Sequence, residues 1–103
     1  MYAIAFDLSN DMLKKTYSET SPNNAYGEIK AVLSQLGFKN QQGSLYFGDK
    51  SCDAVKTVLA AQELAKRFSW FSPSVKDIRM LRIEDNNDLR PAIDLIVPTE
   101  KTK

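Results

Sequence analysis

The sequence contains no histidine, one cysteine and four glycines among its 103 residues. Histidine is the side chain that most often serves as acid and base at neutral pH, so any catalysis must use carboxylates, lysines, hydroxyls or a metal ion. Cys52 has no second thiol to form an intrachain disulfide, and without other cysteines or histidine a structural zinc site is excluded. A free thiol favours a reducing compartment.

Long apolar runs and an excess of one charge are also missing. No run approaches the roughly 18 residues needed to cross a membrane, and Asp7 follows a start without a basic leader. Fourteen basic and thirteen acidic residues leave a net charge of +1, so any nucleic-acid site must be a local patch. We expect a soluble cytoplasmic protein, with residues 1–103 forming a single domain.

Hydrophobic spacing in the first half predicts a strand, a short helix and a longer helix. Tyr2 to Leu8 alternates as a buried strand does. A short helix capped by Ser9 or Asn10 should follow, and then a loop over 19–24. The longer helix should begin at a Ser21 cap and end at Gly37. Its apolar residues recur at helical spacing: Tyr26, Ile29, Val32, Leu33 and Leu36.

The second half predicts a hairpin, another helix and one or two strands. Two extended pieces within Phe38 to Phe47 surround a turn over 40–43. A helix from about Ser51 to Phe68 and a strand from Val75 to Ile83 follow. A fifth, edge-type strand is predicted over Pro91 to Pro98. The apolar stripe expected to pack the helix on a sheet comprises Val55, Val58, Leu59, Ala61, Ala65 and Phe68.

The order βαββαβ with short connections predicts an α+β, ferredoxin-like antiparallel sheet with both helices on one face. In that topology, the end of the first strand and the starts of the third and fourth strands share one end of the sheet, so Asp7, Ser44 and Asp77 should converge. Two carboxylates near a hydroxyl can divide acid and base roles or hold a divalent ion, with Asp7 as candidate ligand and Mg²⁺ as candidate ion. The candidate phosphate contacts are Lys14, Lys15, Lys76 and Arg79.

The same residues can also be interpreted as purely structural, which is the more common role of carboxylates at strand ends. Asp7 would cap the helix that begins near Ser9, and Asp77 would pair with Arg79 or Lys76 as a solvated charge. Cys52, near a helix start, would be an incidental thiol because no histidine could activate it. The aromatic residues are expected in the core or in an interface.

Four stretches of the sequence resemble the VapD family, which is related to the Cas2-type ribonucleases of CRISPR systems. The first is Met1 to Leu8 (MYAIAFDL), which contains Asp7. The second is Leu36-Gly37-Phe38, and the third is Gln42 to Tyr46 (QGSLY), which contains Ser44. The fourth combines Ser74 to Arg79 (SVKDIR) with Arg82 to Asp85 (RIED) and contains Asp77. Together the four stretches cover the chain to about Asp85.

The resemblance implies an endoribonuclease that works as a homodimer through its open sheet faces. It also implies a toxin-like role, with a small antitoxin protein as partner, and a catalytic site at Asp7, with Ser44 and Asp77 as further candidates. After about residue 86 the sequence departs from the family pattern. A Cas2-like adaptor, dimeric but without catalysis, is the alternative function. Whichever function holds, we expect Ile93 to Val97 to add a strand to the sheet edge of the partner subunit.

Overall fold

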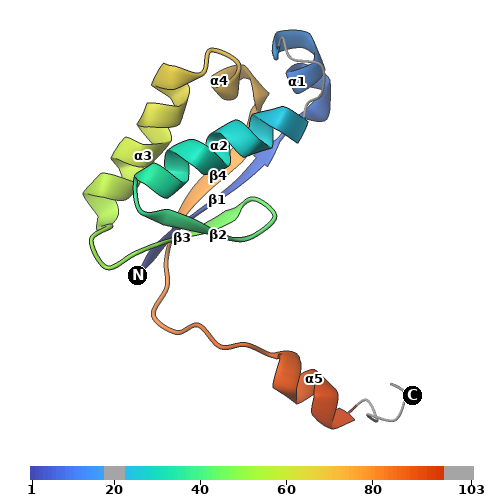
Figure 1. Cartoon of the computed structure of the whole chain (residues 1–103), viewed down its shortest axis with the longest axis vertical. Coiled ribbons are helices and arrows are strands. Elements are labelled where there is room, and N and C mark those ends of the chain that lie inside the picture. Colours follow the sequence, from blue (N-terminus) through green and yellow to red (C-terminus); the bar gives the residue numbers. More distant parts are fainter. Residues whose placement is uncertain (18–22, 97–103) are drawn as a thin grey trace.

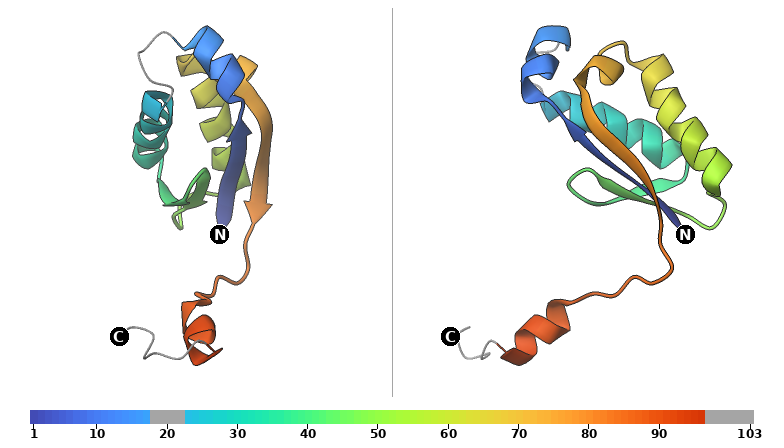
Figure 2. Two further views of the ribbon diagram at one scale, coloured as in Figure 1. Left: turned by 90° about the vertical axis from the view of Figure 1, so that its right-hand side faces the viewer. Right: turned by 180° about the vertical axis from the view of Figure 1, so that it is seen from behind.

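The computed structural model describes residues 1–17 and 23–96. Its sheet has the strand order β2-β3-β1-β4, with every neighbouring pair antiparallel. Helices α2 and α3 cover one face of this sheet and leave the other open (Figures 1 and 2). This is the predicted ferredoxin-like arrangement. The elements are β1 (Tyr2–Leu8), α1 (Asn10–Thr16), α2 (Asn23–Gln35), β2 (Phe38–Gln42), β3 (Leu45–Gly48), α3 (Ala54–Arg67), α4 (Phe71–Ser74), β4 (Val75–Arg82) and α5 (Arg90–Ile96).

Strand β1 supplies the centre of the core. Ile4, Phe6 and Leu8 alternate along it toward the helices and are only 1%, 7% and 6% exposed. The intervening residues Ala5 and Asp7 face the open side, as the period of two in a strand requires. The first strand was therefore predicted correctly, including the face that each side chain occupies.

The short helix α1 begins with a side-chain cap. The Ser9 hydroxyl accepts a hydrogen bond from the Met12 amide at 3.2 Å, which satisfies one of the donors that a helix start leaves free. Ser9 is thus the cap, as one of the two predicted candidates, and the idea that Asp7 performs this role is wrong. The proposed Ser21 cap of the next helix lies outside the described residues.

Helix α2 stops where predicted, because Gly37 adopts a φ of +94° that other residues rarely take. The hairpin that follows has its turn later than predicted. Strand β2 continues through Gln42, with an irregular register after Asn40, and the turn lies at Gly43 and Ser44. Asn40 pairs with Tyr46 in the ladder, and its side-chain amide donates to the Gly43 carbonyl at 2.9 Å.

Helix α3 buries a different face from the predicted one. Its cap is Asp53, whose Oδ1 accepts from the Lys56 amide at 2.8 Å, and its buried residues are Thr57, Ala60 and Leu64. Val55, Val58 and Leu59 were expected to pack on the sheet, but they are exposed. Thr57 can be buried because its hydroxyl donates to the Asp53 carbonyl at 2.7 Å, so an apolar side chain is not required there.

The predicted fifth strand is also wrong for the part that the structure describes. Residues Arg90–Ile96 form helix α5, which stands away from the body on an extended segment (Figure 1). The i,i+4 ion pair between Arg90 and Asp94, with 3.2 Å between Nε and Oδ1, forms only in a helix, and the Asp88 carboxylate accepts from the Arg90 amide at 2.9 Å. Apolar alternation over four residues could not distinguish the two structures.

Candidate active site

Asp7 on β1 and Asp77 on β4 stand directly opposite each other in the sheet. Paired residues of antiparallel strands have Cβ atoms about 4.5–5.5 Å apart and project on the same side, so both carboxylates lie on the open face. Their side chains are 68% and 52% exposed. Like charges directly opposite each other destabilise a sheet, so strand pairing gives no reason for this arrangement.

Two cations accompany the aspartate pair. Arg79 directs its Nε to both oxygens of Asp77 at 3.1 Å, and this contact raises the pKa of the Arg79 guanidinium. The Lys76 ammonium lies 3.9 Å from Oδ2 of Asp7. The Arg79 contact matches the ion pair that the structural interpretation expected for Asp77, whereas Lys76 pairs with Asp7 rather than with Asp77. Two cations therefore lie beside the two carboxylates.

A bulge in β4 explains why Lys76 reaches Asp7. Asp7 pairs with Asp77, but the next residue, Leu8, pairs with Val75, so Lys76 is an extra residue in the ladder. A bulge breaks the strict alternation of side chains and can turn a neighbouring side chain toward a site. Lys76 and Asp77 are consecutive in sequence, yet Asp77 lies opposite Asp7 and the Lys76 ammonium also lies near the Asp7 carboxylate.

The backbone of Ser44 is hydrogen-bonded to the residue that precedes Asp7. Its carbonyl oxygen accepts a hydrogen bond from the Phe6 amide at 3.2 Å, one residue before Asp7. The three strand ends that carry Asp7, Ser44 and Asp77 therefore meet at one end of the sheet, as the topology predicted. The structure gives this contact for the main chain, and the role of the Ser44 hydroxyl stays a prediction.

Helix α1 is held at the same end of the sheet. The Ser9 amide donates to the Ser74 carbonyl at 2.7 Å, and the hydroxyls of Thr16 and Ser74 are 3.4 Å apart. Because Ser74 immediately precedes β4, these contacts fix α1 close to the start of that strand. Lys14 and Lys15 occupy the last turn of α1 and are exposed, so they lie on the element next to the aspartate pair.

The sequence did not reveal that the charge of Asp7 acts on Tyr26. Partial burial raises the pKa of the Tyr26 phenol, and the charge of Asp7 raises it further. The phenol therefore stays protonated at neutral pH. Sequence spacing had assigned Tyr26 only to the apolar face of its helix, and that face does pack against the core. The sequence position of a single tyrosine at core spacing does not indicate that a carboxylate acts on its phenol.

The metal-binding capacity of this part of the chain is modest. Within residues 1–17 and 23–96 no group of three or more acidic, cysteine or histidine side chains is placed to hold an ion. Asp7 and Asp77 supply two carboxylates, which is the number that Mg²⁺ often takes from a protein when water completes its octahedron. The pair thus fits a hydrated ion rather than a dedicated protein cage.

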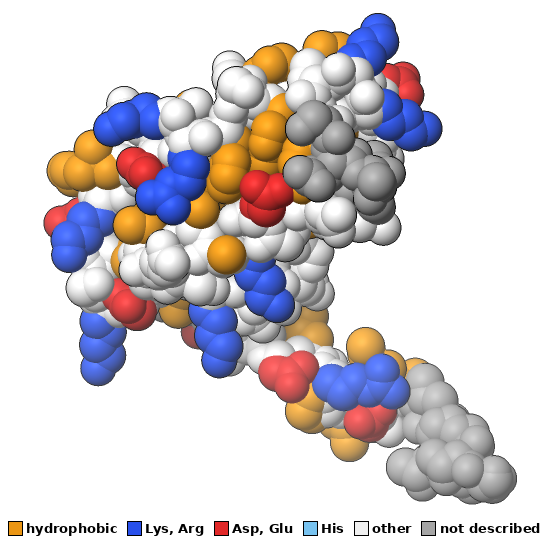
Figure 3. Space-filling model, turned by 45° about the horizontal axis from the view of Figure 1, so that its top comes forward, with side chains coloured by type: hydrophobic (Ala, Val, Ile, Leu, Met, Phe, Trp, Pro, Cys, Tyr) orange, Lys and Arg blue, Asp and Glu red, His pale blue; other side chains and the backbone are white. Residues whose placement is uncertain are grey.

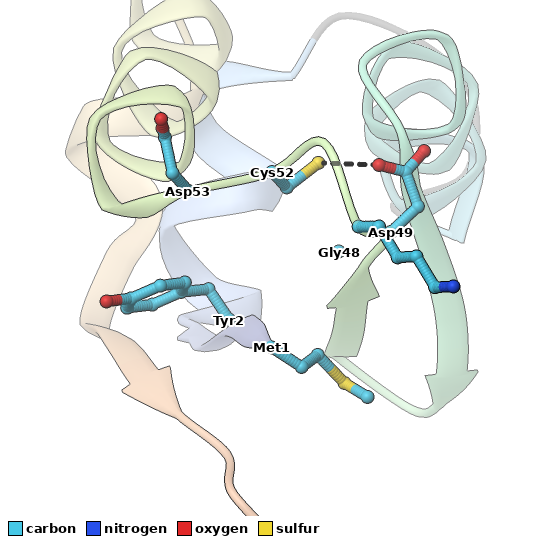
Figure 4. A pocket seen from close by; sticks show the side chains of 7 residues that line it. Met1, Tyr2, Gly48, Asp49, Cys52 and Asp53 are labelled. Carbon is cyan, nitrogen blue, oxygen red and sulfur yellow. Dashed lines mark hydrogen bonds between the residues drawn. The ribbon is translucent and has the colours of Figure 1, made fainter.

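A pocket of about 570 Å³ lies at the other end of β1, lined by Tyr2, Asp49 and Cys52 among others (Figure 4). Tyr2 and Asp7 are five residues apart, about 17 Å along a strand, so this pocket is separate from the aspartate pair. Burial raises the pKa of the Cys52 thiol, which lies 3.5 Å from Oδ1 of Asp49.

Charges on the visible face of the molecule are mixed. Figure 3 shows Lys and Arg side chains distributed among Asp and Glu, without one continuous basic surface. This matches the net charge of +1 and limits any nucleic-acid contact to a small patch. Among the described residues, no helix is long and apolar enough to cross a membrane.

Fold and site together define a small α+β protein with a ferredoxin-like sheet and a paired aspartate centre at one end of its open face. Known proteins give its family. A Riemerella anatipestifer protein named endoribonuclease VapD 2 is 48% identical over 93 residues, which are 90% of this chain and 99% of the relative. An endoribonuclease VapD homolog of Helicobacter pylori is 46% identical over 97 residues, 94% of this chain and 100% of the relative.

A third relative, named endoribonuclease VapD, from Dichelobacter nodosus, is 43% identical over 88 residues, or 85% of this chain and 91% of the relative. No protein-family model matches the sequence. The chain belongs to the VapD family. The resemblance recognised in four short stretches thus extends over most of the chain, including the segment after Asp85 for part of its length.

Proposed function

We propose that this VapD protein is an endoribonuclease and that Asp7 and Asp77 form its reaction centre. The observation that supports this most is the in-register aspartate pair on the open face, because the sheet loses stability by placing two like charges opposite each other. The names of the relatives supply the substrate class, which is RNA. The absence of histidine leaves carboxylates as the natural acid and base.

The chemistry required is one phosphodiester cleavage. A base takes the proton from the attacking hydroxyl, the new oxygen–phosphorus bond forms, and the bond to the leaving oxygen breaks as that oxygen receives a proton. We assign the base role to Asp7 and the acid role to Asp77. Lys76 and Arg79 would bind the phosphate oxygens, with Lys14 and Lys15 holding the strand further along, and Ser44 would orient the phosphate.

Mg²⁺ is the proposed cofactor, with Asp7 as its ligand and Asp77 beside it. Its chemistry would be to neutralise the charge that develops on the phosphate. Asp7 is required whether it binds Mg²⁺ or acts as the base, so loss of activity in an Asp7 variant does not distinguish these two roles. Cleavage in the presence of EDTA does, because only the Mg²⁺ role needs the ion.

We further propose that the protein is a cytoplasmic homodimer that joins through its open sheet faces. Ala3 pairs with Phe47 on one side and with Leu81 on the other, so three apolar side chains lie together on that face. Leu81 is 42% exposed although it is apolar, which favours a partner surface. A toxin-like role with a small antitoxin protein belongs to the same proposal, and the buried free thiol of Cys52 suits a reducing cytoplasm.

The decisive experiment is cleavage of a labelled single-stranded RNA by the wild type, Asp7→Asn and Glu84→Gln. Glu84 pairs with Arg82 at the other end of β4, so Glu84→Gln removes one exposed negative charge away from the site. We expect Asp7→Asn to lose at least about a hundredfold in rate, as removal of a general base does, and Glu84→Gln to keep full activity. Equal activity of all three proteins would place catalysis elsewhere or in a contaminant.

A non-catalytic adaptor is the second candidate, and the ion pairs favour it. Both aspartates are exposed and already contact cations, as structural strand-end charges do. If the folded wild type shows no cleavage with Mg²⁺ or with EDTA, this function replaces the first. In that case Asp7→Asn should leave any cellular phenotype unchanged, while disruption of the dimer should abolish it.

A further inference from the structure

A pocket of about 690 Å³ lies between the β2–β3 hairpin and the segment that follows β4. That segment leaves the sheet and passes below the hairpin on its way to α5 (Figure 1). Ligand pockets in proteins have volumes of about 300–1,000 Å³, so the space is large enough for a small ligand group. Its lining residues are Gln41, Gln42, Leu45, Phe47, Asn86, Asn87, Asp88 and Leu89.

The β3 side of this pocket belongs to the open face of the sheet. Phe47 pairs with Ala3, and Leu45 pairs with Ala5. Both pairs lie on the same side of β1 as Asp7, because side chains alternate along a strand and paired residues project together. Along β1, Ala5 is about 7 Å and Ala3 about 13 Å from Asp7. The pocket therefore opens on the face that carries the aspartate pair, within reach of a short run of nucleotides.

The ring of Phe47 borders the pocket and is not part of the core. Phe38, Tyr46 and Phe71 belong to the buried core cluster, whereas Phe47 is half-buried on the open face. The expected core role of the aromatic residues thus holds for the other three. Unpaired bases of RNA stack on aromatic rings, and exposed faces of small antiparallel sheets present such rings to single strands. Phe47 offers a platform for one base.

Four exposed side-chain amides line the same pocket. They are Gln41, Gln42, Asn86 and Asn87. A side-chain amide offers a donor and an acceptor side by side, which matches the adjacent donor and acceptor groups on the edges of bases. Asn40, on the other face of β2, instead donates to the Gly43 and Leu45 carbonyls at 2.9 and 3.3 Å. The Asn40 amide thus stabilises the hairpin, and the exposed amides of the pocket are available to a ligand.

The charges around the pocket favour a base inside it over a phosphate. Asp88 lines the pocket, and its negative charge repels phosphate. Lys39 is exposed and lies opposite Phe47 in the ladder. Arg79 lies in the same row as Leu45, because both pair with the same residue of β1. Cations at these two positions suit the phosphates of a strand whose base enters the pocket.

We propose that the pocket binds one unpaired base of the RNA substrate, stacked on Phe47 and read by the amides of Gln42 and Asn87. Gln42 pairs with Leu45 and projects on the open face, and Asn87 comes from the opposite wall. The bound base lies a few nucleotides from the bond at the aspartate pair, so the pocket sets the sequence preference of cleavage. This inference rests on the proposed cleavage of RNA and adds a specificity site to it.

Phe47 borders both the pocket and the apolar row with Ala3 and Leu81 that the proposed open-face dimer uses. The other lining residues lie toward β2, which is the edge strand, and on segment 86–89, outside that row. Phe47→Leu separates the two roles, because it keeps an apolar side chain for the dimer and removes the aromatic ring. Its dimer mass should equal that of the wild type.

Binding of short RNA homopolymers of equal length tests the pocket in the full-length protein, with Asp7→Asn in every chain to prevent cleavage. Phe47→Leu should weaken binding at least about fivefold, as loss of one base–aromatic stack does, and should leave binding of an abasic RNA backbone unchanged. The parent protein should prefer one of the adenylate, cytidylate and uridylate homopolymers at least about fivefold. Gln42→Met with Asn87→Leu should remove this preference, and the control Gln35→Met, at the exposed end of α2, should keep it.

A photochemical cross-link locates the base directly. RNA that contains iodouridine should link to the β3 peptide of the Asp7→Asn protein, and Phe47→Leu should abolish this link. The proposal is overturned if the links form only with other elements, if the pocket variants bind RNA as the parent does, or if Phe47→Leu weakens binding of abasic RNA equally. A wild type that binds as expected but never cleaves RNA would support the pocket and contradict the proposed reaction alone.

Discussion

At the scale of single residues, some features of the Asp7–Asp77 pair could be predicted from the sequence and others could not. Asp7 and Asp77 face each other because of the register of β1 and β4, and the bulge at Lys76 brings a cation to them. The position of the three strand ends followed from topology and could be predicted. The bulge and the effect of the Asp7 charge on Tyr26 could not, because both depend on the three-dimensional path of the backbone.

Cys52 provides a prediction at the same scale. Its side chain is 4% exposed, and burial raises the pKa of the thiol above its ordinary value of 9.0. A raised pKa means that the stabilising contribution of the neutral thiol is complete below about pH 9 and is lost as the pH rises past the folded-state value. We expect the folded protein to react with a disulfide reagent at pH 8 at least about tenfold more slowly than the protein in urea. Equal rates would contradict the burial.

At the scale of helices, one apolar pattern was assigned to the wrong face and another to the wrong type of element. Val55, Val58 and Leu59 on α3 are hydrophobic but exposed, and helical spacing alone does not distinguish a buried side chain from an exposed one. The short apolar alternation over Arg90–Ile96 fits a strand as well as the helix that forms. The structure removes this ambiguity for α3, where Thr57 occupies the buried face and satisfies its hydroxyl locally. Boundaries were predicted correctly at the Ser9 cap of α1 and at the Gly37 stop of α2, whereas the turn at Gly43 lies later than predicted.

Gly27, inside helix α2, and Gly37, just after its end, should respond in opposite ways to replacement by alanine. A Cβ built on Gly27, inside the helix, meets nothing within 4 Å, so Gly27→Ala should raise the free energy of unfolding by about 1 kcal/mol. At Gly37 the φ is +94° and a Cβ would lie 2.9 Å from Oδ2 of Asp49 and 3.0 Å from Sγ of Cys52. Gly37→Ala should lower that free energy by about 1–2 kcal/mol. Urea denaturation measures both, and effects of the same sign would disprove the contrast.

At the scale of the whole molecule, the near-neutral charge limits how RNA can bind. Affinity for single strands falls with a log–log salt slope of about −0.7 per phosphate contact, so the four proposed cations of one subunit, Lys14, Lys15, Lys76 and Arg79, predict a slope of about −3. The double variant Lys14→Gln, Lys15→Gln should reduce the slope by about 1.4. Lys30→Gln with Lys66→Gln, on exposed positions of α2 and α3, is the control and should leave the slope unchanged.

This measurement is a titration of labelled RNA at several salt concentrations, with Asp7→Asn used to prevent cleavage. Lys76 and Arg79 must leave their aspartate partners to bind phosphate, so a slope somewhat shallower than the prediction would still fit the four contacts. Identical slopes for the double variant and for the control would place the RNA on another surface. In that case α1 would have no part in binding.

The sequence alone determined the order of the elements and the ferredoxin-like sheet up to β4, because alternation, helical spacing and glycine stops are local properties that tertiary packing reinforced. It also determined that histidine chemistry is excluded and that Asp7, Ser44 and Asp77 belong to one end of the sheet. Tertiary structure decided which face of α3 is buried and where the β4 bulge lies. Both depend on contacts between residues distant in sequence, and no local pattern contains them.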